Sequence, residues 1–380
     1  MSAAAPVSFH AGMAAFDAAA WNALAGDNPF LRHEFLSALE ATGCVAPATG
    51  WTPHHLLIGE AQQPLALAPL YEKSHSWGEF VFDFAWARAW ESRGLAYYQK
   101  LLLAIPFTPA TGPRLLCAPA AGRDGQAAVT ALQAIEAEAR RRSRSSIHAL
   151  FIDEPLRTAA EQAGWLLRRD CHFQWRNRGY RDFDDFLASF AADKRKKAKR
   201  ERRRIAEAGI EFETVSGATL DAATVLRIHE LHALTFIRHG HLPYLNAAFF
   251  SAVATALGAA FIAVLARRAG EIVATAVYFR SADTLYGRYW GSAEEVHSLH
   301  FEACYHQGIE YCIRHGLQRF EPGTQGEHKL ARGFEPAFTW SAHWIADRPM
   351  RQAVAQYLKL EAAGVTEYAD AAARHTPFRD

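Results

Sequence analysis

Cysteine is scarce in this sequence, and the five that occur are scattered, with no C-x-x-C pair: Cys44, Cys117, Cys171, Cys304 and Cys312. This pattern argues against a secreted disulfide framework and against a zinc ribbon. Net charge is equally small, at +1, so no overall field draws nucleic acid or anionic lipid to the chain. We expect reduced thiols in a reducing compartment, and any attraction for polyanions to be local.

Targeting and membrane-spanning segments are also missing. Residues 1–20 are rich in alanine but have no basic segment, so they do not resemble a secretory signal. The one long uncharged run, Leu242–Ala266, is interrupted by proline, asparagine and glycine. We expect it to divide into a helix over Asn246–Leu257 and a strand over Phe261–Ala266. The sequence therefore predicts a cytoplasmic protein with no integral membrane segment.

Metal-site and hydrolase patterns are absent too. The sequence has 18 histidines, but His229 and His232 are one residue short of the H-E-x-x-H spacing that places two imidazoles on one helical face. No order of Ser, His and Asp or of Cys and His suggests a hydrolase. We predict no metal site.

The composition is that of a globular protein, with 50% apolar and 21% charged residues and enough length for two cores. In the second half, strand and helix patterns alternate, and a similar order occurs in the first half around Ile147–Trp175. The pattern predicts an α+β fold with a mixed sheet, built as two tandem lobes over residues 1–178 and 179–380. In the second lobe we expect strands over 261–267, 272–280, 284–290, 317–321 and 337–345, with helices over 297–315 and 327–332.

Ten phrases, in the same order along the chain, carry a family resemblance: Asn28–Phe30, Pro69–Lys73, Gly78–Asp83, Tyr97–Tyr98, Pro106–Pro109, Gly112–Arg114, Cys304–Glu310, Phe320–Lys329, Arg332–Phe334 and Ser341–Trp344. They resemble the FemAB-like proteins, a branch of the acetyltransferase (GNAT) superfamily named for peptidoglycan biosynthesis or recognition. Two positions depart from the family's usual pattern. Gln99 stands where proline commonly follows the tyrosine pair, and His306 stands where a second tyrosine is common.

The resemblance implies tandem GNAT-like lobes with a shared cleft, and an acyltransferase or aminoacyltransferase that forms an amide. The donor would be an aminoacyl-tRNA or an acyl-CoA, with no permanently bound cofactor. The acceptor would be an amine-bearing small molecule or peptide, such as a peptidoglycan-precursor-like peptide. Related Fem ligases have a lysine that is thought to stabilise the transition state, and Lys329 is the matching residue. The alternative is a recognition module that keeps the fold but lacks catalysis.

The residues around Lys329 suit acyl transfer by themselves. A glycine-rich turn that leads into a helix exposes backbone N–H groups, and an ammonium can face a developing oxyanion. Glu327 and His328 are the candidates for accepting the proton of the attacking amine, although an amine that arrives deprotonated needs no base. The same letters also fit an ordinary surface turn.

Further substrate contacts are predicted from the motifs and from the aromatic stretch that contains Asp83. His239 and Tyr244 belong to a loop that we expect near the cleft. The full set of predicted substrate-binding residues is Gly323, Gln325, Gly326, Arg332, Phe334, Trp290, Arg288, Tyr305, His239, Tyr244, Tyr97, Tyr98 and Asp83.

A basic run over Lys194–Arg204 bears on the donor. Its cations surround a helix, so we expect a helix that buries none of its faces and meets tRNA phosphates, a nucleotide-sugar or a lipid head group. The alternative is a solvated helix with no ligand. The predicted anionic-ligand patch is Lys194, Arg195, Lys197, Arg200 and Arg203. In contrast, Ala293–Ser298 has two carboxylates and no glycine where acetyltransferases hold the CoA pyrophosphate, which disfavours acyl-CoA there.

Overall fold

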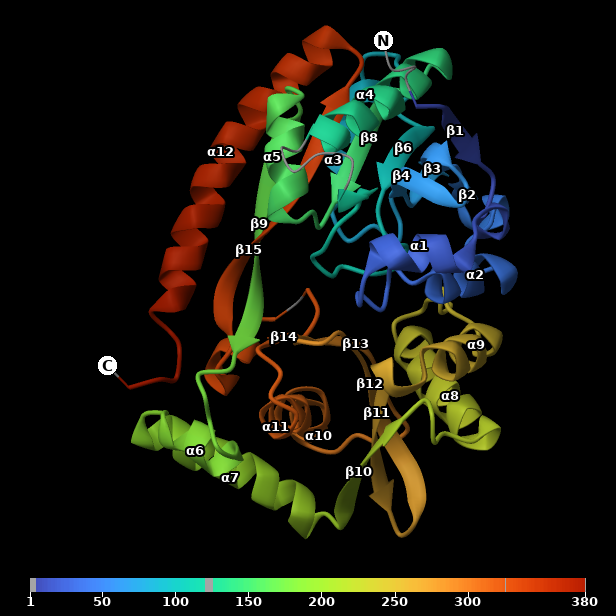
Figure 1. Cartoon of the computed structure of the whole chain (residues 1–380). Coiled ribbons are helices and arrows are strands. Elements are labelled where there is room, and N and C mark those ends of the chain that lie inside the picture. The colour runs from blue at the N-terminus through green and yellow to red at the C-terminus, as the bar shows by residue number, and fades with distance from the viewer. Residues whose placement is uncertain (1–4, 120–125, 325, 380) are drawn as a thin grey trace. The chain divides into compact units, whose positions relative to one another are not determined.

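The computed structural model describes residues 5–119, 126–324 and 326–379 (Figure 1). The chain divides into two compact units. Unit 1 comprises Met1–Asp170 and Phe338–Glu367, and unit 2 comprises Cys171–Ala337 and Tyr368–Asp380. The predicted division into residues 1–178 and 179–380 differs from this one, because the end of the chain returns to unit 1 before its last residues rejoin unit 2.

Unit 1 contains two sheets. The first has the order β15-β8-β6-β5-β2, antiparallel except for the parallel pair β8 and β6. The second is antiparallel throughout, in the order β1-β3-β4-β7. The strands are β1 (Val7–His10), β2 (Trp51–Pro53), β3 (His55–Glu60), β4 (Gln63–Ala68), β5 (Leu70–Lys73), β6 (Lys100–Leu103), β7 (Leu116–Cys117), β8 (Ser146–Leu150) and β15 (Glu335–Ile345).

The helices of unit 1 pack on these sheets. They are α1 (Ala18–Ala25), α2 (His33–Ala41), α3 (Phe84–Glu91), α4 (Gln126–Arg141), α5 (Glu154–Gln162) and the long α12 (Arg348–Ala373), whose last residues belong to unit 2. Strand β9 (Leu166–Arg176) likewise begins in unit 1 and ends in unit 2, whereas β15 begins in unit 2 and enters unit 1 at Phe338. No described helix is both long enough and apolar enough to cross a membrane.

The two faces of the first sheet differ in chemistry. One face contributes Leu101, Ile147 and Trp344 to an apolar core that includes residues of α4 and α5. The other face is also buried, but it carries the polar side chains of Lys73, Lys100, His148, Ser341 and His343. Because successive residues of a strand point to opposite faces, β6, β8 and β15 each supply both environments.

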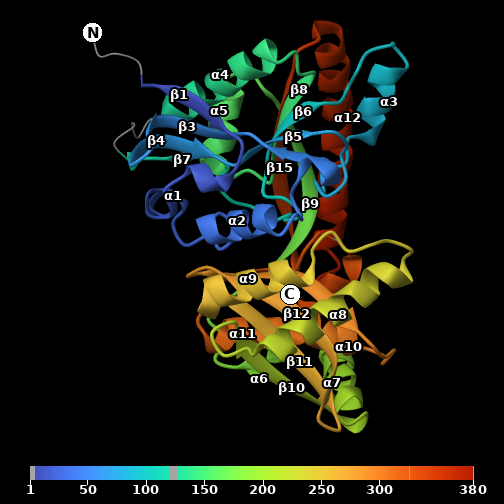
Figure 2. The same cartoon turned by 90° about the vertical axis from the view of Figure 1, so that its right-hand side faces the viewer.

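Unit 2 is built on a sheet of order β10-β11-β12-β13-β14-β9, antiparallel except for the parallel pair β13 and β14. Figures 1 and 2 show α8 and α9 on one face of this sheet and α10 and α11 on the other. The strands are β10 (Ile210–Ser216), β11 (Phe261–Arg268), β12 (Glu271–Arg280), β13 (Thr284–Ser292) and β14 (Arg319–Glu321). The helices are α6 (Phe183–Ala188), α7 (Ala192–Glu207), α8 (Ala222–Arg238), α9 (Ala247–Leu257), α10 (Leu299–Phe301), the π-helical turn η5 (Glu302–His306), α11 (Gln307–Arg314) and the 3-10 helix η6 (Glu327–Arg332).

The local predictions for unit 2 are largely confirmed. The uncharged run Leu242–Ala266 divides into α9 and β11, with Gly258 ending the helix at a φ of 50°. The predicted helix over 297–315 is α10, η5 and α11 in succession, and η6 occupies the predicted residues. The α+β class is confirmed as well.

Close packing of α8 on β13 depends on Gly291. A Cβ there would lie 2.0 Å from the carbonyl oxygen of Leu231, which is backbone and cannot give way. We expect Gly291→Ala to lower the free energy of unfolding by about 1–3 kcal/mol or more. Gly364→Ala is the matched control, since Gly364 lies within α12 and the added Cβ would have no atom within 4 Å apart from adjacent residues and the backbone of its own helix. It should raise stability by about 0.5–1 kcal/mol in denaturant unfolding. Equal effects of the two substitutions would contradict this packing.

Candidate functional site

The chain between β14 and β15 is shaped by glycines. Gly326 has a φ of 105°, and a Cβ on it would lie 2.0 Å from the His328 ring. Gly333 has a φ of 86°, and its Cβ would lie 2.7 Å from the Phe186 ring. L side chains rarely adopt such φ values, so glycine is required at both ends of η6. These two residues fix where Lys329 stands.

Lys329 is buried on η6, with 1% of its surface exposed. Its Nζ donates a hydrogen bond to the carbonyl oxygen of Gly323 at 2.7 Å. No carboxylate among the described residues forms an ion pair with it. Burial therefore lowers the pKa of Lys329 to about 7, which the nearby Cys304 thiol only partly opposes. Lys329 is thus a buried amine whose positive charge is poorly compensated.

His328 lies beside Lys329 but points into an aromatic group. Its Nε2 is 2.9 Å from the Tyr305 hydroxyl, and its ring is 5.3 Å from that of Phe301. Burial, then Lys329 and Arg332, lower the pKa of His328, so its imidazole is neutral at pH 7. Burial also raises the pKa of Tyr305, which keeps its hydroxyl protonated.

Glu327, the other predicted proton acceptor, is exposed. It accepts a hydrogen bond from the Tyr368 hydroxyl at 3.1 Å. This contact joins η6 to the end of α12 within unit 2.

Arg332 connects η6 to α7. Its guanidinium donates to Glu201 of α7 at 2.9 Å and to the carbonyl oxygen of His328 at 2.7 Å, and lies 3.5 Å from the centre of the Phe301 ring. Both members of the Arg332–Glu201 pair are buried. Breaking one side of such a pair leaves an uncompensated buried charge, so this contact holds Lys329 in place indirectly.

The other residues predicted in unit 2 fall into two groups. Trp290 is connected to the residues around Lys329 by the ring of His300. The centre of that ring lies 5.3 Å from the Trp290 ring, 5.3 Å from the Tyr305 ring and 6.1 Å from the His328 ring. Burial lowers the pKa of His300 to about 4. Sequence reasoning missed His300. Its position at the start of the predicted helix, three residues after His297, was the one feature that could have indicated it.

The second group has contacts of a more structural kind. Phe334 is a core residue, His239 ends α8 with its Nδ1 2.7 Å from the Thr235 carbonyl oxygen, and Tyr244 packs on Phe236. Arg288 lies beside Tyr289, with 5.6 Å from its guanidinium carbon to the ring centre. Gln325 lies outside the described residues.

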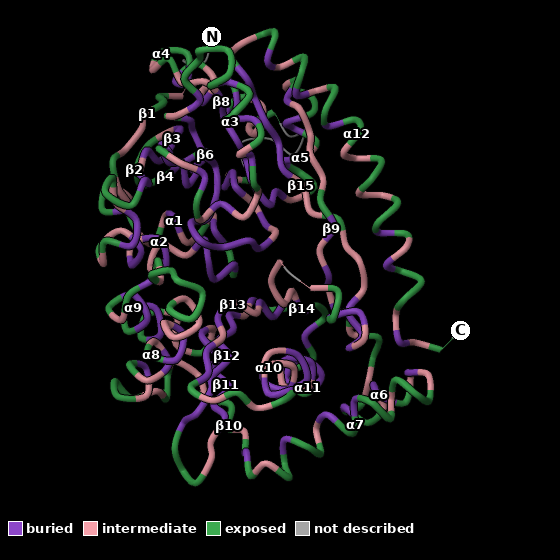
Figure 3. The backbone as a smooth tube through the Cα atoms, turned by 180° about the vertical axis from the view of Figure 1, so that it is seen from behind, coloured by how far each residue is buried: buried purple, intermediate pink, exposed green. Residues whose placement is uncertain are grey.

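The basic helix α7 does bury a face, which corrects the expectation that it buries none. Ala198, Glu201 and Ile205 recur at helical spacing, so they share one face, and all three are buried. Arg332 compensates the charge of Glu201. Figure 3 shows the remainder of α7 as mainly exposed. The sequence pattern hid this face because only three residues form it.

Some cations of α7 are already paired within unit 2. Lys194 pairs with Asp193, Arg203 with Glu207, and Arg195 donates to the Ala188 carbonyl oxygen. Four exposed cations form no ion pair with any described carboxylate: Lys196, Lys197, Arg200 and Arg204. At 3.6 residues per turn they lie on one side of the helix, next to its buried face, and we call them the α7 stripe.

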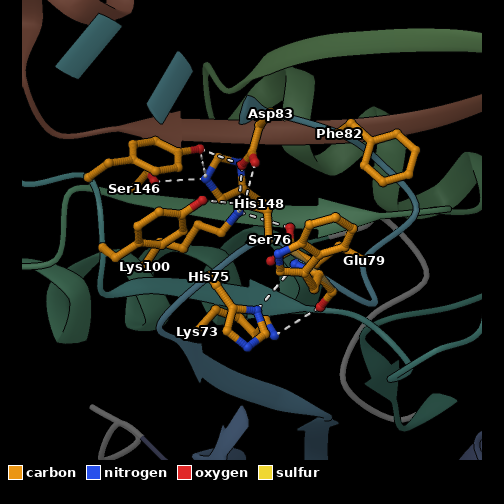
Figure 4. Close-up of polar contacts among 12 residues, drawn as sticks. Lys73, His75, Ser76, Glu79, Phe82, Asp83, Lys100, Ser146 and His148 are labelled. Atoms are coloured by element: carbon orange, nitrogen blue, oxygen red, sulfur yellow. Dashed lines mark hydrogen bonds and ion pairs between the residues drawn. The ribbon is translucent and has the colours of Figure 1, made fainter. Parts of the chain in front are cut away.

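In unit 1 the structure brings the three predicted residues Asp83, Tyr97 and Tyr98 together in one hydrogen-bonded network. Figure 4 shows Asp83 with Lys100 and Ser76 in this network. Lys100 lies at its centre and donates to Asp83 at 2.5 Å, while the Tyr97 hydroxyl donates to the same carboxylate at 2.5 Å. The Ser76 hydroxyl lies 2.8 Å from that of Tyr98 and donates to Asp83. Sequence reasoning missed Lys100 and Ser76.

The charges of this network compensate one another unequally. Lys100 also donates to Glu79 at 2.8 Å, and the two carboxylates raise the pKa of Lys100 although burial acts to lower it. Against burial, Lys100 holds the pKa of Asp83 well below its usual range. Burial raises the pKa of Glu79 to about 7 and lowers the pKa of Lys73 to about 7. Lys100 and Asp83 are therefore firmly charged, while Glu79 and Lys73 can change charge near neutrality.

Two histidines extend the network across β8 and β15. His148 Nε2 is 3.2 Å from the Tyr97 hydroxyl, and His148 Nδ1 is 2.6 Å from His343 Nδ1. Burial lowers the pKa of His148 to about 3 and holds the pKa of His343 well below its ordinary value, so both imidazoles are neutral. The pairing of His343 with His148 across the strands was not foreseen, although the strand over 337–345 that contains His343 had been predicted.

The lowered pKa of Lys329 predicts a dependence of stability on pH. Between pH 7 and about 10.5 the unfolded chain keeps a proton on this amine that the folded chain has lost, so folding becomes more favourable as pH rises through that window. Lys329→Met removes this contribution. Its stability gain over the wild type should be largest near pH 7 and shrink by on the order of a few kcal/mol towards pH 10.

Urea unfolding at pH 7, 8, 9 and 10 measures this difference, with Lys359→Met as the exposed control expected to show none. A gain for Lys329→Met that does not change with pH would show that the buried amine keeps an ordinary pKa.

The chain matches the model of the FemAB-like family, described as peptidoglycan biosynthesis/recognition, over residues 12–380. No functionally curated protein matches it by sequence. The structure of FemX is similar, with 12% identity, 81% of this chain and 92% of FemX covered, and a TM-score of 0.51. A conserved protein of unknown function from Bacteroides thetaiotaomicron has 10% identity, 90% and 100% coverage, and a TM-score of 0.52.

These structural likenesses show the fold alone. A tandem GNAT protein from the clavulanic acid biosynthesis pathway is similar at a TM-score of 0.43, with 15% identity and 90% and 98% coverage, which is too distant to support an argument. The family match covers nearly the whole chain and both described sites. The chain belongs to the FemAB-like family.

Proposed function

We propose that this protein is an acyltransferase or aminoacyltransferase that joins an activated acyl or aminoacyl donor to an amine and forms an amide. The observation that carries the proposal is Lys329, a buried ammonium on a glycine-bounded turn, in a chain whose family is described as peptidoglycan biosynthesis/recognition. The family description makes a peptide of the peptidoglycan-precursor type the acceptor that we favour.

Lys329 would stabilise the tetrahedral intermediate. When an amine attacks an ester or thioester carbonyl, negative charge develops on the carbonyl oxygen, and a cation in a water-poor site stabilises that charge strongly. The Gly323 carbonyl takes one of the three N–H donors of the ammonium, which leaves two for a substrate oxygen. An oxyanion beside Lys329 would also raise the pKa of its amine and hold the proton there.

Removal of the amine's proton would fall to a neighbour of Lys329. The neutral imidazole of His328 can accept a proton at pH 7, and the exposed carboxylate of Glu327 is the other candidate. As the amide bond forms, the donor would lose its leaving group and the amine would lose one proton. Arg332 has a positioning role through its contacts with Glu201 and His328.

The α7 stripe favours aminoacyl-tRNA over acyl-CoA as the donor. Its four cations have no carboxylate partner among the described residues, and α7 is joined to η6 by the buried pair of Arg332 and Glu201. A run of unpaired cations attracts a phosphate backbone and binds it with a strong dependence on salt. An acyl-CoA would not need so long a stripe.

Lys329→Met tests the proposed chemistry. We expect loss of amide product by at least about a hundredfold, which is the effect of removing an oxyanion donor elsewhere. Product formation from charged tRNAs and acyl-CoAs with amine-bearing peptides is followed by mass spectrometry, with circular dichroism to check folding and Lys359→Met as the control. Full turnover by Lys329→Met would exclude this role for the amine. Peptide binding by the wild type without product from any donor would favour the recognition module.

The α7 stripe is tested by changing Lys196, Lys197, Arg200 and Arg204 to glutamine. If aminoacyl-tRNA binds there, its affinity should fall steeply, and the slope of log affinity against log salt should flatten by about 0.7–0.9 for each lost phosphate contact. A matched control changes four exposed cations of unit 1 to glutamine: Arg88, Arg93, Arg348 and Lys359. Similar slopes for both variants would exclude the stripe as the tRNA contact.

A further inference from the structure

The buried polar face of unit 1 begins with a row of three side chains on neighbouring strands. Trp51 of β2 lies opposite Lys73 of β5, and Lys73 lies opposite Lys100 of β6. All three are at most 1% exposed. Two ammonium groups side by side in an interior are costly, because each loses its hydration and repels the other. Such a row needs compensation from the chain that covers it.

Residues 74–83, which we call the 74–83 loop, supply that compensation to only one of the two lysines. Lys100 donates to Ser76, Glu79 and Asp83, so its three N–H groups all have acceptors. Lys73 donates to the carbonyl oxygen of Trp77 at 3.2 Å and otherwise lies over the Trp51 ring, 3.7 Å from its centre. Among the residues that the structure describes, the Lys73 ammonium therefore has N–H donors without an acceptor.

Two further polar groups near Lys73 lack a hydrogen-bond partner within the described part of the chain. They are Nε1 of Trp51 and Oε1 of Glu79, each on a residue that is at least nine-tenths buried. The other carboxylate oxygen of Glu79 accepts from Lys100, and neither of its oxygens lies within 4.0 Å of the Lys73 amine. The indole edge of Trp51 meets the same loop, since a Cβ on Gly78 would lie 3.3 Å from its Cζ2.

Buried polar atoms in proteins are almost always hydrogen-bonded, so these atoms call for a group that the chain does not provide. The unused donors are the Lys73 ammonium and the Trp51 N–H, and a protonated Glu79 would add an O–H. We propose that Trp51, Lys73 and Glu79 form a binding site in unit 1 for a carboxylate, such as the terminal carboxylate of an amino acid or a peptide. This site is separate from Lys329, and its binding can be measured without any turnover.

A cationic ligand fits these residues less well. Lys73 already occupies the face of the Trp51 ring that would attract an ammonium, and both Lys73 and Lys100 would repel a second positive charge. A carboxylate instead brings one negative charge to the lysine that lacks a carboxylate contact. Trp77 links this site to the surface, because its carbonyl oxygen accepts from Lys73 while its side chain is 62% exposed.

Binding should take up protons near neutral pH. The charged groups that face Lys73 are Glu79, Asp83 and Lys100, and the imidazole of His75 lies within its electrostatic reach. Glu79 faces Lys73, Lys100 and Asp83. A bound carboxylate favours the protonated forms of both Lys73 and Glu79, whose pKa values lie at about 7. The affinity should therefore fall as pH rises from 6 to 8, by up to about tenfold per unit for each group.

Titration calorimetry on the full chain tests the site with N-acetylalanine and N-acetylalanyl-alanine as carboxylate probes. N-acetylalaninamide, which lacks the carboxylate, is the matched control ligand. We expect both acids to bind with proton uptake, measured in two buffers of different ionisation enthalpy, and the amide not to bind. Tighter binding of the dipeptide would identify a peptide terminus as the source, and tighter binding of the single residue would identify an amino acid.

Variants locate the binding. Lys73→Met should weaken it at least tenfold, Trp51→Phe should weaken it severalfold, and Glu79→Gln should retain binding with one proton less taken up. Lys359→Met should match the wild type. The proposal is overturned if neither acid binds, if the amide binds as well as the acids, if inorganic phosphate binds in their place, or if Lys73→Met binds normally. Should Lys73→Met fail to fold, normal binding and proton uptake by both Trp51→Phe and Glu79→Gln would overturn it equally.

Discussion

The cost of burying lysine charge is the constraint on which both described sites depend. An ammonium that loses its water must find anions or hydrogen-bond acceptors, or else its pKa falls until it becomes neutral. Lys100 finds two carboxylates and keeps its charge. Lys329 finds one backbone carbonyl, and Lys73 finds a carbonyl and an aromatic ring, so the pKa of each falls to about 7.

This constraint explains why backbone shape is so specific near the lysines. The carbonyl of Gly323 reaches Lys329 only because glycines at 323 and 326 accept positive φ values in the preceding turn. In unit 1 the 74–83 loop turns through Gly78 so that Glu79 and Asp83 both reach Lys100. In both places the turn delivers oxygen atoms to an amine that the sheet or helix has placed in the interior.

The sequence allowed the prediction of features that depend on local pattern. The glycine-bounded turn, η6, and the division of Leu242–Ala266 into α9 and β11 all follow from glycine positions and apolar spacing. Features that depend on distant partners were not predictable. Lys100, His148 and His343 occupy alternate positions in strands, where polar residues usually indicate a solvent-facing side. Distant parts of the chain, the covering loop, α3 and α12, make that face an interior. The buried face of α7 was missed because only three residues form it and because Arg332, which compensates Glu201, lies far along the chain.

The different compensation of the three lysines separates structural from chemical roles. A lysine with two carboxylate contacts, such as Lys100, stays charged at every physiological pH and can do little but hold its neighbours. A lysine with a pKa near 7 responds to any negative charge that arrives, because that charge raises the pKa and brings a proton to the amine. Lys329 would respond in this way to an oxyanion, and Lys73 to a carboxylate. One physical principle therefore accounts for an amine suited to reaction in unit 2 and an amine suited to binding in unit 1.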